Sequence, residues 1–232
     1  MSDRGEPAMG ISERKEKEKE VRRNDIIDAS EKVFFSKGYD AATIDDIARE
    51  AEFSKRTIYV YFNSKEQLYF EVMVRGYKKL IQMMEASIDE ASVPSALDQL
   101  RQFAGTLYKF SREYPNYFKA IMEYENGDRD FANGVPDPSR EECYLLGEKM
   151  FAYLTSALKN GIEQGVVRSD LDVVNAAIVL WSCTLGLFNT LIKKRNYILH
   201  YYKRDSEELL LEGFDILIRS IQKEHGGTGD EK

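Results

Sequence analysis

Apolar residues recur at spacings of three and four through long stretches of this chain that contain no proline. Near the C-terminus, Leu210, Phe214, Leu217, Ile218 and Ile221 fall on one face of a helix. The five prolines stand where helices could begin or end, and the alternation typical of strands is scarce. With 232 residues, of which 43% are apolar, the chain can bury a core without disulfides. The sequence therefore predicts an all-α protein.

Cysteine and histidine are too few for several classes of function. Cys143 and Cys183 are the only cysteines, and His200 and His225 are the only histidines. Their scattered positions argue against a disulfide framework, a metal site or a nucleophile–base pair. No Gly-rich phosphate loop is present either. We therefore expect a protein without cofactors that is not an enzyme and whose reduced thiols place it in the cytoplasm.

One segment is long enough to cross a membrane. Residues 173–192 carry no charge over 20 positions, although Asn175, Ser182 and Thr184 are polar. No second such segment exists, and the charged first 25 residues do not resemble a signal peptide. We expect a helix buried on all sides and no membrane, with a transmembrane span as the alternative.

The distribution of charge argues for a specific rather than a general affinity for polyanions. The formal net charge is −7, and residues 1–65 carry 13 Lys and Arg against 14 Asp and Glu. Within residues 53–65, however, three cations stand without any acid. This short segment is compatible with a specific contact to nucleic acid.

Residues 24–73 contain the clearest succession of short helices. Thr43, Ser54 and Ser64 are N-cap candidates, and Asp46 and Gln67 complete the capping-box spacing after the first and the third. The first of these helices ends at Gly38, and two further helices follow it. The apolar residues that we expect to face inward on the three helices are Ile26, Ala29, Val33, Phe34, Ile44, Ile47, Ala48, Ala51, Ile58 and Phe62. Three helices in so short a stretch predict helix-turn-helix geometry.

Spacing within this stretch supports that geometry. Ala48 supplies a small residue where two helices nearly touch, and Ile58 supplies a branched plug ten positions later. The tight turn usually holds glycine, but this sequence has Glu52 there. Keeping a left-handed conformation at Glu52 would cost about 1 kcal/mol.

The third helix of this group presents a surface suited to DNA. An α-helix fits the major groove, where Lys and Arg read guanine and the Thr methyl touches thymine. A cation in the first turn of the next helix opposes the helix dipole, so we interpret Lys65 as a phosphate clamp. The residues left outward or at the ends of the third helix are Lys55, Arg56, Thr57, Tyr59 and Tyr61.

The run from Thr43 to Met73 resembles the DNA-binding segment of TetR-family (tetracycline-repressor-like) regulators. It reads TIDDIAREAEFSKRTIYVYFNSKEQLYFEVM, and Ser54–Leu68 is its most specific part. The resemblance covers residues 22–75, less than a quarter of the chain. It implies a ligand-responsive transcriptional regulator, which we expect to be a repressor.

The resemblance also assigns roles to single residues. Thr43 and Lys65 would hold phosphates, and Tyr61 would lie beside the DNA backbone. Arg22 and Arg23 are further candidates for the backbone or the minor groove. The residues implied to face the major groove are Lys55, Arg56, Thr57 and Tyr59. An outward-pointing Asp45 would repel DNA.

The remaining chain divides into an expected domain and two tails. We expect residues 21–70 to bind DNA and residues 71–225 to form a helical effector-binding and dimerisation domain. Residues 1–20 would be a frayed charged tail, although i,i+4 pairs such as Glu13 with Lys17 could extend the first helix backward. Residues 126–139 read as a loop, and residues 226–232 as a disordered tail.

The resemblance implies an effector pocket in the C-terminal domain. Cavities between bundle helices are common ligand sites, and aromatic and Met side chains favour a lipophilic or aromatic effector. Most such side chains in a helical domain belong to the core. Our candidates for the pocket are Phe103, Leu107, Phe118, Met122, Phe151 and Trp181.

Two apolar helices near the C-terminus predict a homodimer. Residues 173–192 and 206–223 carry more apolar surface than one domain readily hides, and a symmetric four-helix bundle would cover it. Two related DNA-reading helices then require a roughly palindromic site on double-stranded DNA. The alternatives are a helical small-molecule-binding protein that does not use DNA and, with least support, an enzyme.

Overall fold

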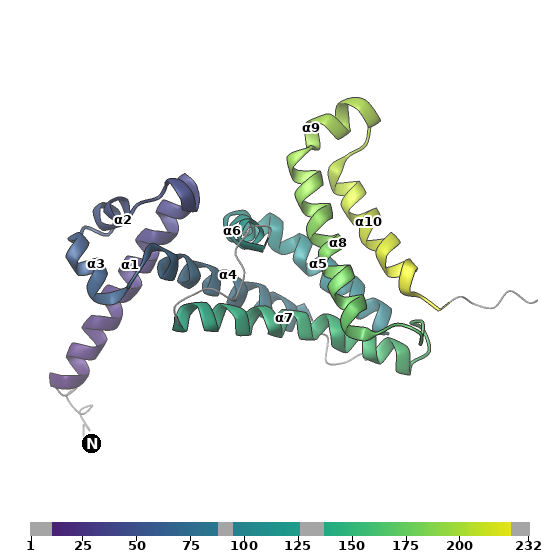
Figure 1. The fold of residues 1–232 in the computed structure, drawn as a ribbon, viewed down its shortest axis with the longest axis horizontal. Coiled ribbons are helices and arrows are strands. Elements are labelled where there is room, and N and C mark those ends of the chain that lie inside the picture. Colours follow the sequence, from purple (N-terminus) through teal and green to yellow (C-terminus); the bar gives the residue numbers. More distant parts are fainter. Residues whose placement is uncertain (1–10, 88–94, 126–136, 224–232) are drawn as a thin grey trace, which may run out of the picture.

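The computed structural model describes residues 11–87, 95–125 and 137–223, which form an all-helical chain (Figure 1). The predicted all-α class is confirmed, since the described residues contain no strand beyond an isolated bridge between Val167 and Gln222. The helices are α1 (Ile11–Ala41), α2 (Ile44–Glu50), α3 (Lys55–Tyr61), α4 (Lys65–Ser87), α5 (Ala96–Glu113), α6 (Pro115–Glu125), α7 (Pro138–Glu163), α8 (Val173–Lys193), α9 (Arg195–Tyr197), a π-helical turn (Ile198–Tyr202) and α10 (Ser206–Ile221).

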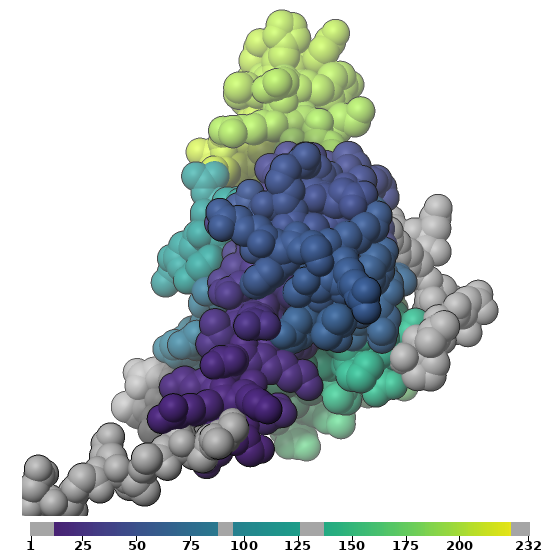
Figure 2. All heavy atoms as spheres, turned by 90° about the vertical axis from the view of Figure 1, so that its left-hand side faces the viewer, coloured from purple at the N-terminus to yellow at the C-terminus, as the bar shows by residue number. Residues whose placement is uncertain are grey.

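Helices α1 to α3 form a head at one end of the molecule. The inward positions expected from the sequence are buried, with Ile26, Ile47 and Ile58 fully so, except that Ala51 is only partly buried. Gly38 interrupts α1 with φ of 75° and ψ of 166°, which bends the chain toward α2. Figure 2 looks onto this head, with the hairpin of α8 and α10 rising above it.

The start of α1 differs from the expected tail. Residues 11–20 are helical, so the prediction of a frayed tail is wrong for them, while residues 1–10 lie outside the described residues. These turns are exposed and extend past the head. Alternating charges permit i,i+4 pairs, and a helix nucleated by its buried part around Ile26 propagates at low cost.

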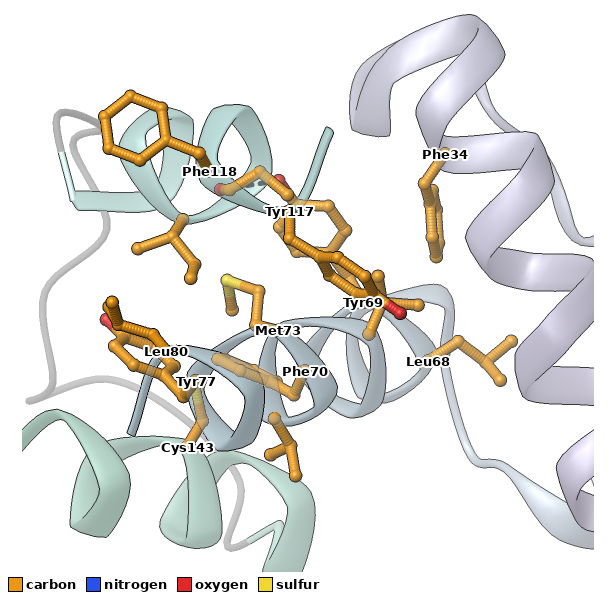
Figure 3. Close-up of a cluster of buried hydrophobic side chains, with 14 of the residues drawn as sticks. Phe34, Leu68, Tyr69, Phe70, Met73, Tyr77, Leu80, Tyr117, Phe118 and Cys143 are labelled. Carbon is orange, nitrogen blue, oxygen red and sulfur yellow. Dashed lines mark hydrogen bonds between the residues drawn. The ribbon is translucent and has the colours of Figure 1, made fainter. Parts of the chain in front are cut away.

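Helix α4 is the spine that joins the head to the remaining helices. It packs along α7 and also against α1, α5 and α6. Figure 3 shows Leu68 on the side of α1, and Met73 and Tyr77 among residues of α6 and α7. The hydroxyl of Tyr69 donates to the carbonyl of Ala120 at 3.0 Å. One apolar core therefore continues from the head into the C-terminal helices.

Helices α8 and α10 form a long hairpin that projects from the body (Figures 1 and 2). Gly213 allows their close approach, since a Cβ there would lie 2.9 Å from Cδ1 of Leu187. The buried side of α8 holds Ala177, Leu180, Phe188 and Leu191.

The prediction that residues 173–192 are buried on all sides is wrong. The side chains of Val174, Ile178 and Val179 are 53%, 50% and 59% exposed. One chain covers only one face of this uncharged helix, because α10 and the body lie on the same side. Among the described helices, α8 alone has the length and apolar composition of a membrane span, and one such helix is weak evidence because core helices of soluble proteins have them too.

Candidate DNA-binding interface

Helix α2 is fixed at its start by the predicted capping box. The hydroxyl of Thr43 accepts the N–H of Asp46 at 3.1 Å, and Oδ2 of Asp46 accepts the N–H of Thr43 at 3.2 Å. Lys37 lies 2.8 Å from Asp46 Oδ1. Hydrogen bonds from Lys37 and Thr43 lower the pKa of Asp46 to about 2. Of the two aspartates in the first turn, Asp46 is thus turned to its own cap.

The turn between α2 and α3 keeps the left-handed conformation expected at Glu52, whose φ is 59°. The N–H of Phe53 then reaches the carbonyl of Ala48 at 2.9 Å, which closes the turn. Ser54 caps α3 by accepting the N–H of Thr57 at 3.1 Å. Local chemistry thus sets the angle at which α3 leaves α2.

Helix α3 presents one exposed face away from the head's core. This face consists of two pairs of residues four positions apart, Lys55 with Tyr59 and Arg56 with Val60. Tyr59 is 49% and Val60 70% exposed. We did not select Val60 from the sequence, although its position two residues after the buried Ile58 was a usable signal.

The remaining residues predicted on α3 lie at the edges of this face. Thr57 and Tyr61 are half-buried, and the hydroxyl of Thr57 lies 2.8 Å from that of Ser54. Thr57 therefore contributes to the cap and offers less of its surface than Lys55 or Arg56.

The cations of α3 are not equivalent. Lys55 pairs with Asp45 of α2 at 3.0 Å, which raises the lysine pKa through that hydrogen bond. Asp45 therefore does point outward, but its charge is balanced by Lys55. Arg56 has no ion pair within the described part of the chain. Arg56 is the cation of α3 most available to an external anion.

Lys65 points back into the head. Its ammonium group donates to the carbonyls of Tyr39 at 2.8 Å and Ala42 at 3.0 Å, and lies 3.5 Å from that of Asp40. It also lies 4.3 Å from the centre of the Tyr39 ring. Carbonyls near the end of α1 therefore compensate this cation at a helix start without any phosphate, and the predicted phosphate contact of Lys65 stays a prediction.

The arginines before the buried part of α1 differ in direction. Arg22 is exposed beside Phe53 and Val21, in a groove that also receives Arg14. Arg23 instead binds Glu71 of α4 at 2.5 Å and stacks over Phe62. Arg22 therefore faces solvent, as a contact with DNA would require, whereas the guanidinium of Arg23 is held by Glu71 and Phe62 although 42% of the Arg23 side chain is exposed.

The six residues expected to line an effector pocket do not surround one cavity. Phe103 and Trp181 line a small cavity of about 40 Å³ between α5, α8 and α10. Leu107 and Phe118 are buried in the core. Met122 and Phe151 are partly buried and pack against the core, and neither lines this cavity or the larger one described below. Periodicity places an aromatic side chain inside the fold but does not separate core from cavity wall.

A larger cavity lies between α4, α5 and α7. Its volume is about 210 Å³, and none of the described residues that line it is charged. The side chains that line this cavity combine amides and hydroxyls with apolar groups, whereas the sequence led us to expect aromatic and Met side chains. The lining residues are Met84, Ser87, Gln99, Gln102, Phe103, Tyr153 and Ser156.

A capped helix-turn-helix with an exposed polar helix, followed by a larger helical domain, defines a DNA-binding transcriptional regulator. Residues 26–72 match the model of the bacterial regulatory proteins of the tetR family. The chain is 30% identical over 155 residues to the uncharacterised HTH-type transcriptional regulator YfiR of Bacillus subtilis, an alignment that covers 63% of this chain and 68% of YfiR. The chain therefore belongs to the TetR family of transcriptional regulators.

Two further similarities are found, one in sequence and one in fold. The transcriptional repressor DhaR of Mycobacterium sp. strain GP1 is 25% identical over 64% of this chain and 71% of its own length. The solved structure of the Bacillus subtilis regulator FadR, in complex with stearoyl-CoA, shares the fold. It has a TM-score of 0.65 at 21% identity and covers 85% of this chain and 98% of that chain.

Proposed function

We propose that this regulator is a cytoplasmic homodimeric repressor that binds a palindromic DNA site and responds to a small effector. The observation that carries the proposal is the exposed face of α3, which we name the recognition helix. Arg56 and Lys55 suit guanine edges, and the apolar Val60 suits a thymine methyl group in the major groove. The repressor name of the relative DhaR supports repression.

Further contacts would lie around the recognition helix. The exposed Thr43 at the start of α2 and the half-buried Tyr61 at the end of the recognition helix suit phosphate oxygens. Arg22 extends the same cationic surface along α1. In this proposal Lys65 holds the junction of α1 and α2 and affects DNA indirectly.

The apolar face of α8 supports a dimer. It consists of Val174, Ile178, Val179, Ser182, Cys183 and Gly186, all exposed and uncharged. On α10, Leu211 and Ile216 are also 47% and 55% exposed. A second copy would bury these side chains in a four-helix bundle and place two recognition helices about one DNA turn apart.

We propose that residues 21–70 act as the DNA-binding domain and residues 71–225 as the effector and dimerisation domain. The border falls inside α4, so one continuous helix would carry a movement from one domain to the other. The predicted C-terminal tail lies outside the described residues, as does most of the predicted loop 126–139.

The cavity between α4, α5 and α7 is our candidate for the effector site. Its volume of about 210 Å³ is below the usual range for ligand pockets, so we expect a small ligand or an opening of the helices. Gln99 and Gln102 supply neutral hydrogen-bonding groups, while Met84 and Phe103 supply apolar contact. An effector with an apolar body and an uncharged polar group fits this lining. It would regulate DNA binding by its difference in affinity for two conformations.

Selection of preferred sites from a random duplex pool tests the function directly. We expect enrichment of a twofold-symmetric sequence, with affinity for it falling steeply as salt rises. A scrambled duplex of equal length and composition is the control. If no sequence is enriched and the two duplexes bind equally, the alternative of a helical ligand-binding protein that does not use DNA replaces this proposal.

A further inference from the structure

Glu71 is the one charged side chain buried among the described residues, with 8% of the residue exposed. It lies on α4 between the head and α7. Removing a carboxylate from water costs several kcal/mol unless partners compensate the charge, so its surroundings are informative.

The partners of Glu71 come from two different helices. Oε1 accepts a hydrogen bond from the guanidinium of Arg23 in α1 at 2.5 Å. The same oxygen accepts the hydroxyl of Ser139, in the first turn of α7, at 2.6 Å. Ser139 is 4% exposed, and Asp137 accepts its N–H at 2.8 Å. One carboxylate oxygen therefore ties the DNA-binding head to a helix of the effector domain.

Arg23 carries this connection to the recognition helix. Its guanidinium carbon lies 5.2 Å from the centre of the Phe62 ring. Phe62 is the C-cap of α3 and is 1% exposed. A line of contacts thus runs from Ser139 through Glu71 and Arg23 to the end of the helix that faces DNA.

We propose that Glu71 is a positioning residue that couples α7 to the recognition helix. The inference rests on the proposed function and deepens it by naming the regulatory contact. When the start of α7 moves, Ser139 withdraws from Oε1, and the buried charge must be balanced by Arg23 alone. Arg23 then shifts over Phe62 and changes the angle of α3. The coupling is sensitive because the carboxylate has little solvent to replace a lost partner.

An ion pair between α4 and α7 provides a matched comparison for the hydrogen bond between Glu71 and Ser139, which joins the same two helices. Lys78 of α4 and Glu142 of α7 lie 2.6 Å apart, but their side chains are 58% and 46% exposed. Water replaces either partner there, so breaking this pair costs little. The Glu71–Ser139 and Lys78–Glu142 contacts both join α4 to α7, but only the first is buried and connected to α3.

The test uses the full-length variants Ser139→Ala and Glu71→Gln, with Thr155→Ala and Glu142→Gln as controls. Thr155 is an exposed hydroxyl of α7, and Glu142 is the exposed carboxylate just described. The probe is the duplex that the wild-type chain selects from a random pool, measured against a scrambled duplex. Thermal unfolding is recorded for each variant, and affinities are compared where all are folded.

We expect Glu71→Gln to lower the preference for the selected duplex by roughly 10-fold and Ser139→Ala by roughly 3-fold, while both controls keep it. The double variant should lose no more than Glu71→Gln, because Ser139 acts through Glu71. Amide hydrogen exchange in α3 should quicken in Ser139→Ala, although this residue lies on α7. A folded Ser139→Ala with wild-type preference and unchanged exchange in α3 would overturn the coupling. If the wild-type chain selects no duplex, the proposed function fails, whereas a selective wild type with unaffected variants refutes only this inference.

Discussion

The recognition helix and the apolar face of α8 are both exposed, but their chemistry is opposite. Helix α3 presents two cations beside a tyrosine and a valine, whereas the face of α8 presents aliphatic and small side chains without charge. The first surface gains from a polyanion, and the second gains only from exclusion of water. The absence of charge on an exposed surface thus indicates the kind of partner as clearly as the presence of cations does.

The largest effect should follow from placing a charge on the apolar face of α8. We expect Ile178→Glu to separate the dimer and to lower affinity for a palindromic duplex by roughly 100-fold, because two linked heads bind more tightly than one. Sedimentation and DNA titration measure both. Leu145→Glu, at a residue of α7 that is 70% exposed, should leave both unchanged. A dimeric Ile178→Glu variant would exclude this face as the interface.

Changing the charged face of α3 should affect sequence preference rather than assembly. Arg56→Ala should reduce affinity for the selected duplex by roughly 10-fold while the dimer persists, because a base contact is lost. The matched control is Arg101→Ala, which changes an exposed arginine of α5. Equal losses on selected and scrambled duplexes would show that Arg56 contacts phosphate instead of bases.

The head shows how far sequence reasoning reaches. The caps and the buried Ile58 could be predicted because each depends on neighbours within a few residues, whereas the conformation of Glu52 was left open. Lys65 could not, because the carbonyls it binds belong to Tyr39 and Ala42, more than 20 positions earlier. The sequence correctly indicated that a cation at a helix start needs a partner, but it could not identify that partner.

The C-terminal domain was less predictable for the same reason. Its helices and the apolar character of α8 follow from periodicity, yet the side of α8 that stays exposed depends on where α10 packs. The cavity is formed by three helices distant in sequence, so only Phe103 among the predicted residues lines it. Burial follows from pattern, whereas a void depends on how surfaces fit together.

Lys65→Met separates a structural from a DNA-binding role for that side chain. We expect unfolding free energy to fall by about 2 kcal/mol, because charge-assisted hydrogen bonds to the end of α1 are lost. The control Lys78→Met, at an exposed ion pair, should change stability by less than about 0.5 kcal/mol. Chemical denaturation without DNA gives both values. Wild-type stability with weaker DNA binding would restore the phosphate clamp.

A smaller effect of opposite sign is expected in the turn. Glu52→Gly should stabilise the chain by about 1 kcal/mol, because glycine adopts the φ of 59° without steric cost. Glu50→Gly, at the last residue of α2, should instead destabilise it, because glycine is a poorer helix former and the ion pair with Lys32 is lost. Denaturation midpoints of the two variants should therefore move in opposite directions. Destabilisation by both would show that Glu52 contributes contacts that outweigh its strain.

The last effect appears only in acid. The pKa of Asp46 is depressed to about 2, below its ordinary value of 3.8, so its contribution is present above about pH 4 and is lost as pH falls toward 2. Asp46→Asn should remove this part of the pH dependence of unfolding. An NMR titration of the Asp46 carboxyl that gives an ordinary pKa would contradict the capping-box account.

Protection of the selected duplex against hydroxyl radicals tests most directly whether the recognition helix binds DNA while the apolar face of α8 binds a second copy of the chain. Two chains joined through α8 and α10, each inserting α3, predict two equivalent protected patches related by a twofold axis and separated by about one helical turn. A single protected half-site, bound with one chain per duplex, would contradict the symmetric arrangement.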